Sequence, residues 1–386
     1  MKWTNKGHQF DRFSEIFSNE MKVYIYGAGE NGKDLFSRMM FADCVEAFID
    51  NDERKVGDIF CGKKILSLHE FISKKKEKHF VVIAQSLSNI VLSKQQFLCA
   101  GYIEGKNLFD YHSFVRFYLP IFAVYSWDKI YIPTVSMLMT TICNLDCKGC
   151  LNFTHLNKNK MHYPLEQLKE NVDCLFSQIN GVGLFHLCGG EPLLYPHFTE
   201  IMNYISVKYG NKISELGITT NGTIIPSDEL CIQMSNANLS VWVDDYRKNV
   251  EIANGTYETI LKKMRNFRVK YYANYVDEWI NIEKENIDTD EEKNINKCTL
   301  CSIPFVSLKN NKVYGCNYSD YACEANIVNG ISGDYWELSQ ISNNKKIFME
   351  YRMGYSDNGY YSYCSKCEGS IAINFNKIPV AEQYSL

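Results

Sequence analysis

The sequence predicts an α/β protein built around parallel sheets, and three observations lead to this fold class. Between residues 130 and 279, short apolar strands alternate with amphipathic helical segments, which is the pattern of βα units in a parallel sheet. Ahead of them, an apolar strand at 22–26 runs through a glycine-rich turn into a helical segment. The last part of the chain is rich in cysteine. We therefore expect three domains, over residues 1–120, 121–285 and 286–386.

Composition narrows the class of protein. The chain has 386 residues, of which 46% are hydrophobic and 22% charged, and its formal net charge is -4. This balance is typical of a soluble globular protein and lacks the basic excess that nucleic-acid binding usually leaves. The longest apolar stretch, at 115–127, is too short to span a bilayer, and the polar N-terminus lacks the apolar core of a signal peptide. We expect a cytoplasmic protein without nucleic-acid or membrane partners.

The N-terminal glycines fit a phosphate-binding turn. Gly27, Gly29 and Gly32 satisfy the pattern G-x-G-x-x-G between a strand and a helix, where the free N–H groups at the helix N-terminus favour anions. Asp50 ends the next strand, at about the position of a ribose-binding acid. These four residues are candidates for binding a nucleotide.

This first unit is short for a dinucleotide-binding domain. Only two more strands, at 64–65 and 80–84, are expected before residue 111, which makes it half of a Rossmann fold at most. The segments GAG, FIDND and KVGDIFCGKKI resemble the abbreviated nucleotide-binding modules of sugar-modifying and polysaccharide-locus proteins. Two alternatives stay open: nucleotide binding, or a docking or dimerisation module with an empty phosphate loop.

The βα region places its motifs at one edge of a sheet. The expected strands are 134–140, 183–187, 215–219 and 240–243, and the expected helices are 165–179, 198–209 and 228–237. A cysteine-rich loop follows the first strand, GGEP the second and TNG the third. Because the carboxyl ends of parallel strands share one edge, where ligands bind in such folds, we expect the three motifs to converge.

The loop TICNLDCKGC carries a metal site. Cys143, Cys147 and Cys150 lie within eight residues, and thiolates select iron–sulfur clusters or zinc over harder ions. A structural zinc site would normally be completed by a fourth nearby Cys or His, but His155 follows at a spacing that no common zinc template uses. Three ligands leave a fourth coordination position open.

The order CxxxCxxC, Gly189-Gly190-Glu191-Pro192 and Thr220-Asn221-Gly222 resembles that of the radical S-adenosylmethionine (SAM) enzymes. The resemblance implies a partial (β/α)6 barrel over residues 121–285. It also implies that the three cysteines bind a 4Fe-4S cluster, whose fourth iron is chelated by SAM. Electron transfer then cleaves SAM to methionine and a deoxyadenosyl radical, which abstracts hydrogen from a substrate.

The resemblance also assigns the SAM contacts. Gly189 and Gly190 would let the backbone approach the methionyl amino group, and Glu191 would hold that ammonium. Asn221 and Asp244 fall where the family often contacts the SAM ribose and carboxylate, although related sequences commonly place Ser at the position of Asp244, which could instead touch substrate. Many members have an aromatic residue just before the last cysteine to pack on adenine. Gly149 stands there, so the contact must come from elsewhere, and Phe153 is one suggestion.

The C-terminal cysteines resemble an auxiliary-cluster extension of the twitch or SPASM type. They are Cys298, Cys301, Cys316, Cys323, Cys364 and Cys367. The resemblance implies one auxiliary 4Fe-4S cluster, bound by Cys316, Cys364, Cys367 and one of Cys298 and Cys301. A zinc site with paired CxxC knuckles is the structural alternative. Cys323, or whichever of Cys298 and Cys301 is not a ligand, could return a hydrogen atom to the substrate; the alternative is that both are merely buried. The remaining cysteines are expected to be small buried hydrophobic residues: Cys44, Cys61, Cys99, Cys174, Cys188 and Cys231.

Together these features predict a radical SAM enzyme that acts on a sugar or nucleotide-linked sugar by oxidation, dehydration or epimerisation. Its electron donor would be a protein such as flavodoxin or ferredoxin. The sugar expectation rests on the N-terminal module and on the resemblance of CNLDCKGCLNF and TNGTIIP to proteins of carbohydrate loci. Alternatives are a maturase of a ribosomally made peptide and, in a different class, a non-catalytic metal-cluster scaffold.

Overall fold

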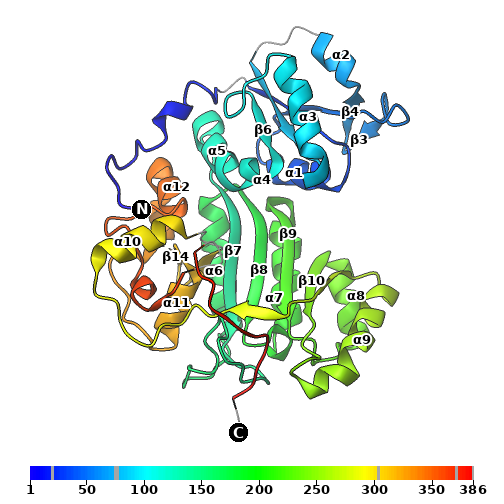
Figure 1. Ribbon diagram of the computed structural model, residues 1–386. Helices are drawn as coiled ribbons and strands as arrows, with labels where there is room; N and C mark the ends of the chain where they lie inside the picture. The colour runs from blue at the N-terminus through cyan, green and yellow to red at the C-terminus, as the bar shows by residue number, and fades with distance from the viewer. Residues whose placement is uncertain (19–20, 74–77, 302–304, 370–372, 385–386) are drawn as a thin grey trace.

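Two sheets organise the computed structural model, which describes residues 1–18, 21–73, 78–301, 305–369 and 373–384 (Figure 1). The first sheet has the strand order β3-β4-β2-β1-β5-β6, and every neighbouring pair is parallel except β3 and β4. Its strands are β1 (Lys22–Tyr26), β2 (Val45–Ile49), β3 (Ile59–Phe60), β4 (Lys63–Leu66), β5 (His79–Ile83) and β6 (Leu108–Asp110). Its helices are α1 (Glu30–Met39), α2 (Leu68–Ser73) and α3 (Leu87–Cys99).

This first sheet is larger than the sequence predicts. The order of strand, glycine turn and helix is confirmed at β1 and α1, and β4 and β5 are the two further strands expected. The limit of half a Rossmann fold is wrong, because β3 and β6 extend the sheet at both edges. These strands have two and three residues. Apolar periodicity identifies strands of roughly four to eight residues, so it missed them.

The second sheet carries the βα units, and the α/β class with a partial barrel is confirmed. Its order is β11-β10-β9-β8-β7-β13-β14-β15, with parallel pairing from β11 through β7 to β13. Its strands are β7 (Tyr131–Thr140), β8 (Gly181–Gly189), β9 (Ile213–Thr220), β10 (Leu239–Asp244), β11 (Lys270–Asn274), β13 (Val306–Lys309), β14 (Lys312–Tyr314) and β15 (Tyr335–Glu337). The connecting helices are α6 (Leu165–Gln178), α7 (Phe198–Tyr209), α8 (Asp228–Asn236) and α9 (Glu251–Asn266). The expected boundary at residue 285 therefore divides the strands of one continuous sheet.

A buried helix joins the two sheets. After α4 (Tyr111–Ser113) and a π-helical turn (Phe114–Tyr118), the chain enters α5 (Leu119–Trp127), of which seven of nine residues are buried. A helix that is apolar all round packs inside a protein, and the ring of Phe122 lies 5.3 Å from that of Phe80 in β5. No helix in the described part of the chain is long and apolar enough to cross a bilayer.

The first sheet packs against the amino ends of the barrel strands. Arg38 of α1 donates to the Tyr131 hydroxyl at the start of β7 (3.3 Å), and the ring of Phe41 stacks on that of Tyr131 at 5.6 Å. Figure 1 shows this module at the end of β7, β8 and β9 opposite to the C-terminus. A ligand of the module and a ligand of the carboxyl ends of the barrel strands would therefore lie at opposite ends.

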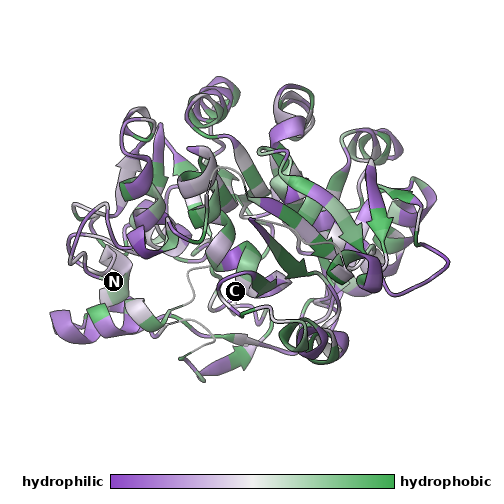
Figure 2. Cartoon of the chain, turned by 90° about the horizontal axis from the view of Figure 1, so that it is seen from above, coloured by the Kyte–Doolittle hydropathy of each residue, from purple (hydrophilic) through white to green (hydrophobic). Residues whose placement is uncertain are grey.

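The last third of the chain covers one flank of the barrel and its mouth. Its helices are α10 (Glu291–Leu300), α11 (Asn317–Glu324) and α12 (Lys345–Arg352). A two-stranded antiparallel ribbon pairs β12 (Glu278–Ile280) with β16 (Lys377–Pro379). Seen from above, hydrophobic residues concentrate on the inner strands, whereas the surrounding helices also carry hydrophilic residues (Figure 2).

Candidate active site

The three loop cysteines line one cavity. β7 ends at Thr140, and the loop that follows places Cys143, Cys147 and Cys150 in the wall of a cavity of about 270 Å³. Residues at the carboxyl ends of β8, β9 and β10 complete this wall: Gly189, Gly190, Glu191, Asn221 and Asp244. The structure thus brings together every residue that the sequence assigned to the cluster and to SAM.

The donor set fits an iron–sulfur cluster. Burial raises the pKa of Cys143 to about 11 and that of Cys147 to about 12, so thiolates at these positions need a positive charge beside them. Among the described residues, no three His, Cys, Asp or Glu side chains are arranged to hold a metal ion. A cluster is larger than one ion, and its thiolates surround several metal atoms rather than one point.

Side-chain amides tie the cysteine loop to the other two motifs. Asn221 Nδ2 donates to Asn144 Oδ1 at 3.0 Å, and Asn144 Nδ2 donates to Thr223 Oγ1 at 2.7 Å. Asn152 Nδ2 donates to the carbonyl oxygen of Gly189 at 2.5 Å. The loop is therefore anchored to the ends of β8 and β9.

The glycines of GGEP allow the turn to pack on the cysteine loop. A Cβ on Gly190 would lie 2.3 Å from the carbonyl oxygen of Ile142, and Glu191 N donates to that same oxygen at 2.9 Å. A Cβ on Gly189 would lie 2.7 Å from a methyl group of Thr140. Any larger residue would push the two motifs apart, so the glycines fix the cavity wall.

Glu191 is buried at the centre of this wall. Its carboxylate accepts from Thr220 Oγ1 and Asn221 N, both at 2.9 Å, and from Leu193 N at 3.1 Å. Burial nevertheless raises the pKa of Glu191 to about 7. A carboxylate has roughly four acceptor sites, so one stays available for a cationic donor in the cavity.

Asp244 is a second, half-buried acid in the same wall. It accepts from the Tyr246 hydroxyl and from Asn274 Nδ2, each at 2.6 Å, and burial raises its pKa. Tyr246 and Trp279 line the cavity beside it, with their rings 5.6 Å apart and edge to face. Two acids and these two rings form a surface suited to a cationic ligand with an aromatic base.

The position of Gly149 has a structural explanation. Gly149 has φ +63°, and a Cβ there would lie 2.1 Å from Cδ1 of Ile378 in β16. The C-terminal ribbon therefore fills the space next to the last cysteine. The suggestion that Phe153 contacts adenine is wrong, because Phe153 is fully buried, packs edge to face on Tyr363 and does not line the cavity.

Sequence reasoning missed a further part of the cavity wall. It is lined by Ser136, His186, Cys188, Thr219, Phe305, Asn317, Tyr318 and Tyr321. His186 is neutral at physiological pH because burial lowers its pKa to about 4, and its Nε2 lies 3.1 Å from Thr219 Oγ1. Polar residues at every second position of an apolar strand, as in the segment FHLCGG, were the available signal.

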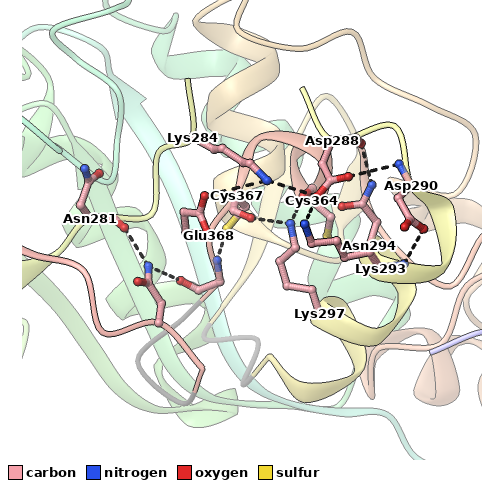
Figure 3. A network of polar contacts seen from close by, with 12 residues as sticks. Asn281, Lys284, Asp288, Asp290, Lys293, Asn294, Lys297, Cys364, Cys367 and Glu368 are labelled. Carbon is pink, nitrogen blue, oxygen red and sulfur yellow. Dashed lines mark hydrogen bonds and ion pairs between the residues drawn. The ribbon is translucent and has the colours of Figure 1, made fainter. Parts of the chain in front are cut away.

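The auxiliary cysteines also meet. Five of them line one small cavity beside Ile282, Tyr361 and Tyr363: Cys298, Cys301, Cys316, Cys364 and Cys367. Cys298 interacts with Cys364, and the structure does not choose between Cys298 and Cys301 as the fourth ligand. Lys297 Nζ donates to the carbonyl oxygens of Cys364 and Cys367 at 2.7 and 2.6 Å, which fixes that turn (Figure 3). This cation also places positive charge close to the thiols.

Cys323 lies away from both cavities. It belongs to α11, its Sγ lies 3.7 Å from Ser362 Oγ, and it lines neither the large cavity nor the small one. A hydrogen-atom donor must reach its substrate, and this position does not support that expectation.

The N-terminal glycines form a separate pocket. Gly27, Gly29 and Asp50 line it together with Lys55. A Cβ on Gly32 would lie 2.0 Å from the carbonyl oxygen of Gly27, so this glycine lets α1 pack on the turn. Asp50 accepts from Ala28 N at 2.9 Å and from Lys55 Nζ at 3.2 Å, which holds the turn itself.

Three thiols and a buried acid at the carboxyl edge of a parallel α/β sheet define an enzyme with a thiolate-bound metal cofactor. Residues 137–292, which contain all three motifs, match the family model of the radical SAM superfamily. This part of the chain is therefore a radical SAM domain, and members of that superfamily use a 4Fe-4S cluster and SAM.

Individual relatives match only part of the chain. A probable GTP 3',8-cyclase of Methanococcus aeolicus is 33% identical over 95 residues, which cover 24% of this chain and 31% of the relative. The antilisterial bacteriocin subtilosin biosynthesis protein AlbA of Bacillus subtilis is 30% identical over 93 residues, 24% of this chain and 19% of AlbA. A crystal structure of BtrN in complex with AdoMet and 2-DOIA is 14% identical with a TM-score of 0.41, and covers 66% of this chain and 97% of that chain. This chain thus spans less than a third of the length of these two curated relatives.

Proposed function

We propose that this protein cleaves SAM reductively and uses the resulting deoxyadenosyl radical to abstract hydrogen from the neutral, hydroxyl-bearing sugar part of its substrate, which is a sugar or a nucleotide-linked sugar. The observation that carries the proposal is the single cavity lined by Cys143, Cys147, Cys150 and Glu191. The overall reaction would be an oxidation, a dehydration or an epimerisation.

Different residues of the cavity would bind the cluster and the different parts of SAM. The three loop thiolates would hold the 4Fe-4S cluster, which supplies the electron for SAM cleavage when it is bound. Glu191 would accept the SAM ammonium with its remaining acceptor site. Asn221 and Asp244 would hold the ribose and carboxylate side. Each of these side chains is fixed by hydrogen bonds before the cofactor arrives, and such preorganisation reduces the free energy lost on binding.

The further part of the cavity wall, which sequence reasoning missed, supports a neutral substrate. Ser136, Thr219 and Tyr321 bear hydroxyl groups, His186 is a neutral imidazole, and Phe305 stacks on it at 5.9 Å. No Lys or Arg among the described residues lines this cavity. Phosphates and carboxylates are usually bound by such cations, so the diphosphate of a nucleotide-linked sugar would have to lie outside.

The N-terminal pocket supports the sugar assignment less than the sequence suggested. It lies beyond the amino ends of the barrel strands, so a nucleotide at Gly27, Gly29, Gly32 and Asp50 would not reach the cysteine loop of the same chain. We propose it as a separate nucleotide or docking site. Calorimetric titration with nucleotide-sugars tests this proposal. Binding heat that disappears in the Gly29→Arg variant would support a nucleotide site. The absence of binding heat would support a docking module instead.

A peptide maturase is the second candidate. Its support is the likeness to AlbA, a bacteriocin biosynthesis protein. Incubation of the reconstituted protein with SAM, reductant and either neutral saccharides or small peptides separates the two. If the substrate is a sugar, saccharides should raise deoxyadenosine formation and be converted to a product that chromatography separates from them, whereas stimulation by peptides alone would contradict the sugar proposal.

The remaining parts complete the electron supply. The five C-terminal cysteines would hold one auxiliary 4Fe-4S cluster with four of their thiolates. A flavodoxin or ferredoxin would deliver electrons, and the reducing cytoplasm would keep the cysteines as the free thiols that the structure shows.

A further inference from the structure

Cys188 lines the cavity, which a cysteine with a purely structural role has no need to do. It is the next-to-last residue of β8, directly before Gly189, and its side chain lines the same cavity as the cluster cysteines. The sequence predicted a small buried hydrophobic residue here. Side chains alternate along a strand, so Leu187 points into the core while His186 and Cys188 face the cavity.

Two hydroxyl groups surround this thiol. The Tyr321 hydroxyl lies 2.9 Å from Cys188 Sγ, Ser136 Oγ lies 3.1 Å from it, and the two hydroxyls also contact each other. All three side chains line the cavity. Burial raises the pKa of the Cys188 thiol to about 11, so it keeps its hydrogen at physiological pH.

A nearby residue of the same cavity has a polar atom without a partner among the described residues. Asn317 lies one helical turn before Tyr321 on α11, so both face the same cavity. Asn317 is 6% exposed, and its Oδ1 is buried without a hydrogen-bond partner. A buried amide oxygen normally has a partner, and a water or another bound molecule with a hydroxyl or N–H group could supply one here.

We propose that Cys188 is a hydrogen-atom donor to carbon radicals in this cavity, next to a substrate anchored at Asn317. The proposal rests on the function proposed above and selects among its reactions: hydrogen is returned to the substrate carbon, as in an epimerisation. Tyr321 and Ser136 act as positioning residues that hold the thiol and can pass it a proton.

The step balances. The S–H bond of Cys188 breaks homolytically and a C–H bond forms on the substrate, which leaves a sulfur radical. One electron from the flavodoxin- or ferredoxin-type donor and one proton from the hydroxyl network restore the thiol. With the electron used to cleave SAM, each turnover consumes two electrons and one proton and gives methionine and deoxyadenosine.

The test needs no identified substrate. The reconstituted protein is given SAM and dithionite in deuterium oxide, where thiol hydrogens exchange for deuterium. Without substrate, the deoxyadenosyl radical takes hydrogen from a donor within reach, and mass spectrometry measures deuterium in the deoxyadenosine. We expect singly deuterated product from the unaltered protein and about a tenfold lower labelled yield from Cys188→Ser, because an O–H bond is much stronger than an S–H bond.

Control variants show whether the labelling depends on Cys188 itself. Cys323→Ser should label deoxyadenosine as fully as the unaltered protein, and equilibrium dialysis of SAM together with iron content should show that Cys188→Ser still folds and binds its cofactors. Equal labelling in Cys188→Ser, or unlabelled product from the unaltered protein, would overturn the hydrogen-donor proposal and leave SAM cleavage intact. A protein that forms no deoxyadenosine would instead refute the proposed function as well.

Discussion

Gln383 Nε2 donates a hydrogen bond of 3.0 Å to Cys147 Sγ, although the two residues are 236 positions apart in the chain. The Gln383 Oε1 accepts from Asp146 N at 2.8 Å, and Lys148 N donates to the carbonyl oxygen of Glu382 at 2.7 Å. The C-terminal segment 380–384 is therefore part of the wall around the cysteine loop. It brings an N–H donor to a thiol that the cluster would use.

Gln383→Leu should lower the reduction potential of the cluster at the cysteine loop. An N–H donor to sulfur stabilises the more negatively charged reduced cluster, and a hydrogen bond worth about 1 kcal/mol corresponds to roughly 40 mV for a one-electron couple. Potentiometric titration followed by electron paramagnetic resonance measures the shift. Lys148→Met is the control, because its partly exposed ion pair with Glu382 should leave the potential unchanged. An unchanged potential in Gln383→Leu would contradict this role.

Gly149→Ala should destabilise the protein by about 2–4 kcal/mol. The new methyl group would clash with Ile378, and φ +63° is strained for any residue with a Cβ. Chemical unfolding of the apo protein measures the loss. Ile378→Val removes the clashing Cδ1 and should recover part of it in the double variant. Strictly additive effects of the two substitutions would show that the side chains do not meet.

SAM affinity should weaken as the pH falls below about 7. Burial raises the pKa of Glu191 above its usual value, so the carboxyl group takes up a proton through this range, and a protonated acid no longer attracts the SAM ammonium. Equilibrium dialysis between about pH 6 and pH 8 measures the dependence. Glu191→Gln should bind SAM more weakly at the upper end and without this pH dependence. A variant with the same profile as the unaltered protein would exclude Glu191 as the ammonium partner.

Asn317→Ala should leave the free energy of unfolding within about 0.5 kcal/mol of the original value, or raise it, because the buried Oδ1 that it removes has no partner. Ser307→Ala on the adjacent strand is the comparison. It removes a hydrogen bond to the buried Asp320 and should lower stability by about 1–3 kcal/mol. A large loss of unfolding free energy in Asn317→Ala would mean that the Asn317 side chain stabilises the fold and is not reserved for binding a ligand.

The sequence predicted that the three motifs converge, and the structure brings them together for a physical reason. Cys143, Glu191 and Asn221 each follow a strand of a parallel sheet, and parallel strands present their carboxyl ends along one edge. Local periodicity is therefore enough to place the three motifs together. The gathering of the C-terminal cysteines was expected from their resemblance to an auxiliary-cluster extension, and five of them do line one small cavity.

The rest depended on contacts between distant segments. The pairing of Trp279 with Ile378 in the terminal ribbon, and the filling of the space at Gly149, follow from strand register that no local pattern specifies. Cys188 looked like a core residue because its neighbours are apolar. Only the placement of Tyr321 by α11 against β8 shows that its thiol faces a polar cavity.

The measurement that tests the central claim most directly is deoxyadenosine formation by two sets of cysteine variants. The iron-loaded protein is supplied with SAM and dithionite under anaerobic conditions. We expect deoxyadenosine and methionine from the unaltered protein, none when Cys143, Cys147 and Cys150 are all replaced by alanine, and continued formation when Cys316, Cys364 and Cys367 are replaced instead. Failure of the unaltered, cluster-loaded protein to form deoxyadenosine, or its undiminished formation without the three loop thiols, would contradict the assignment of this cavity as the site of SAM cleavage.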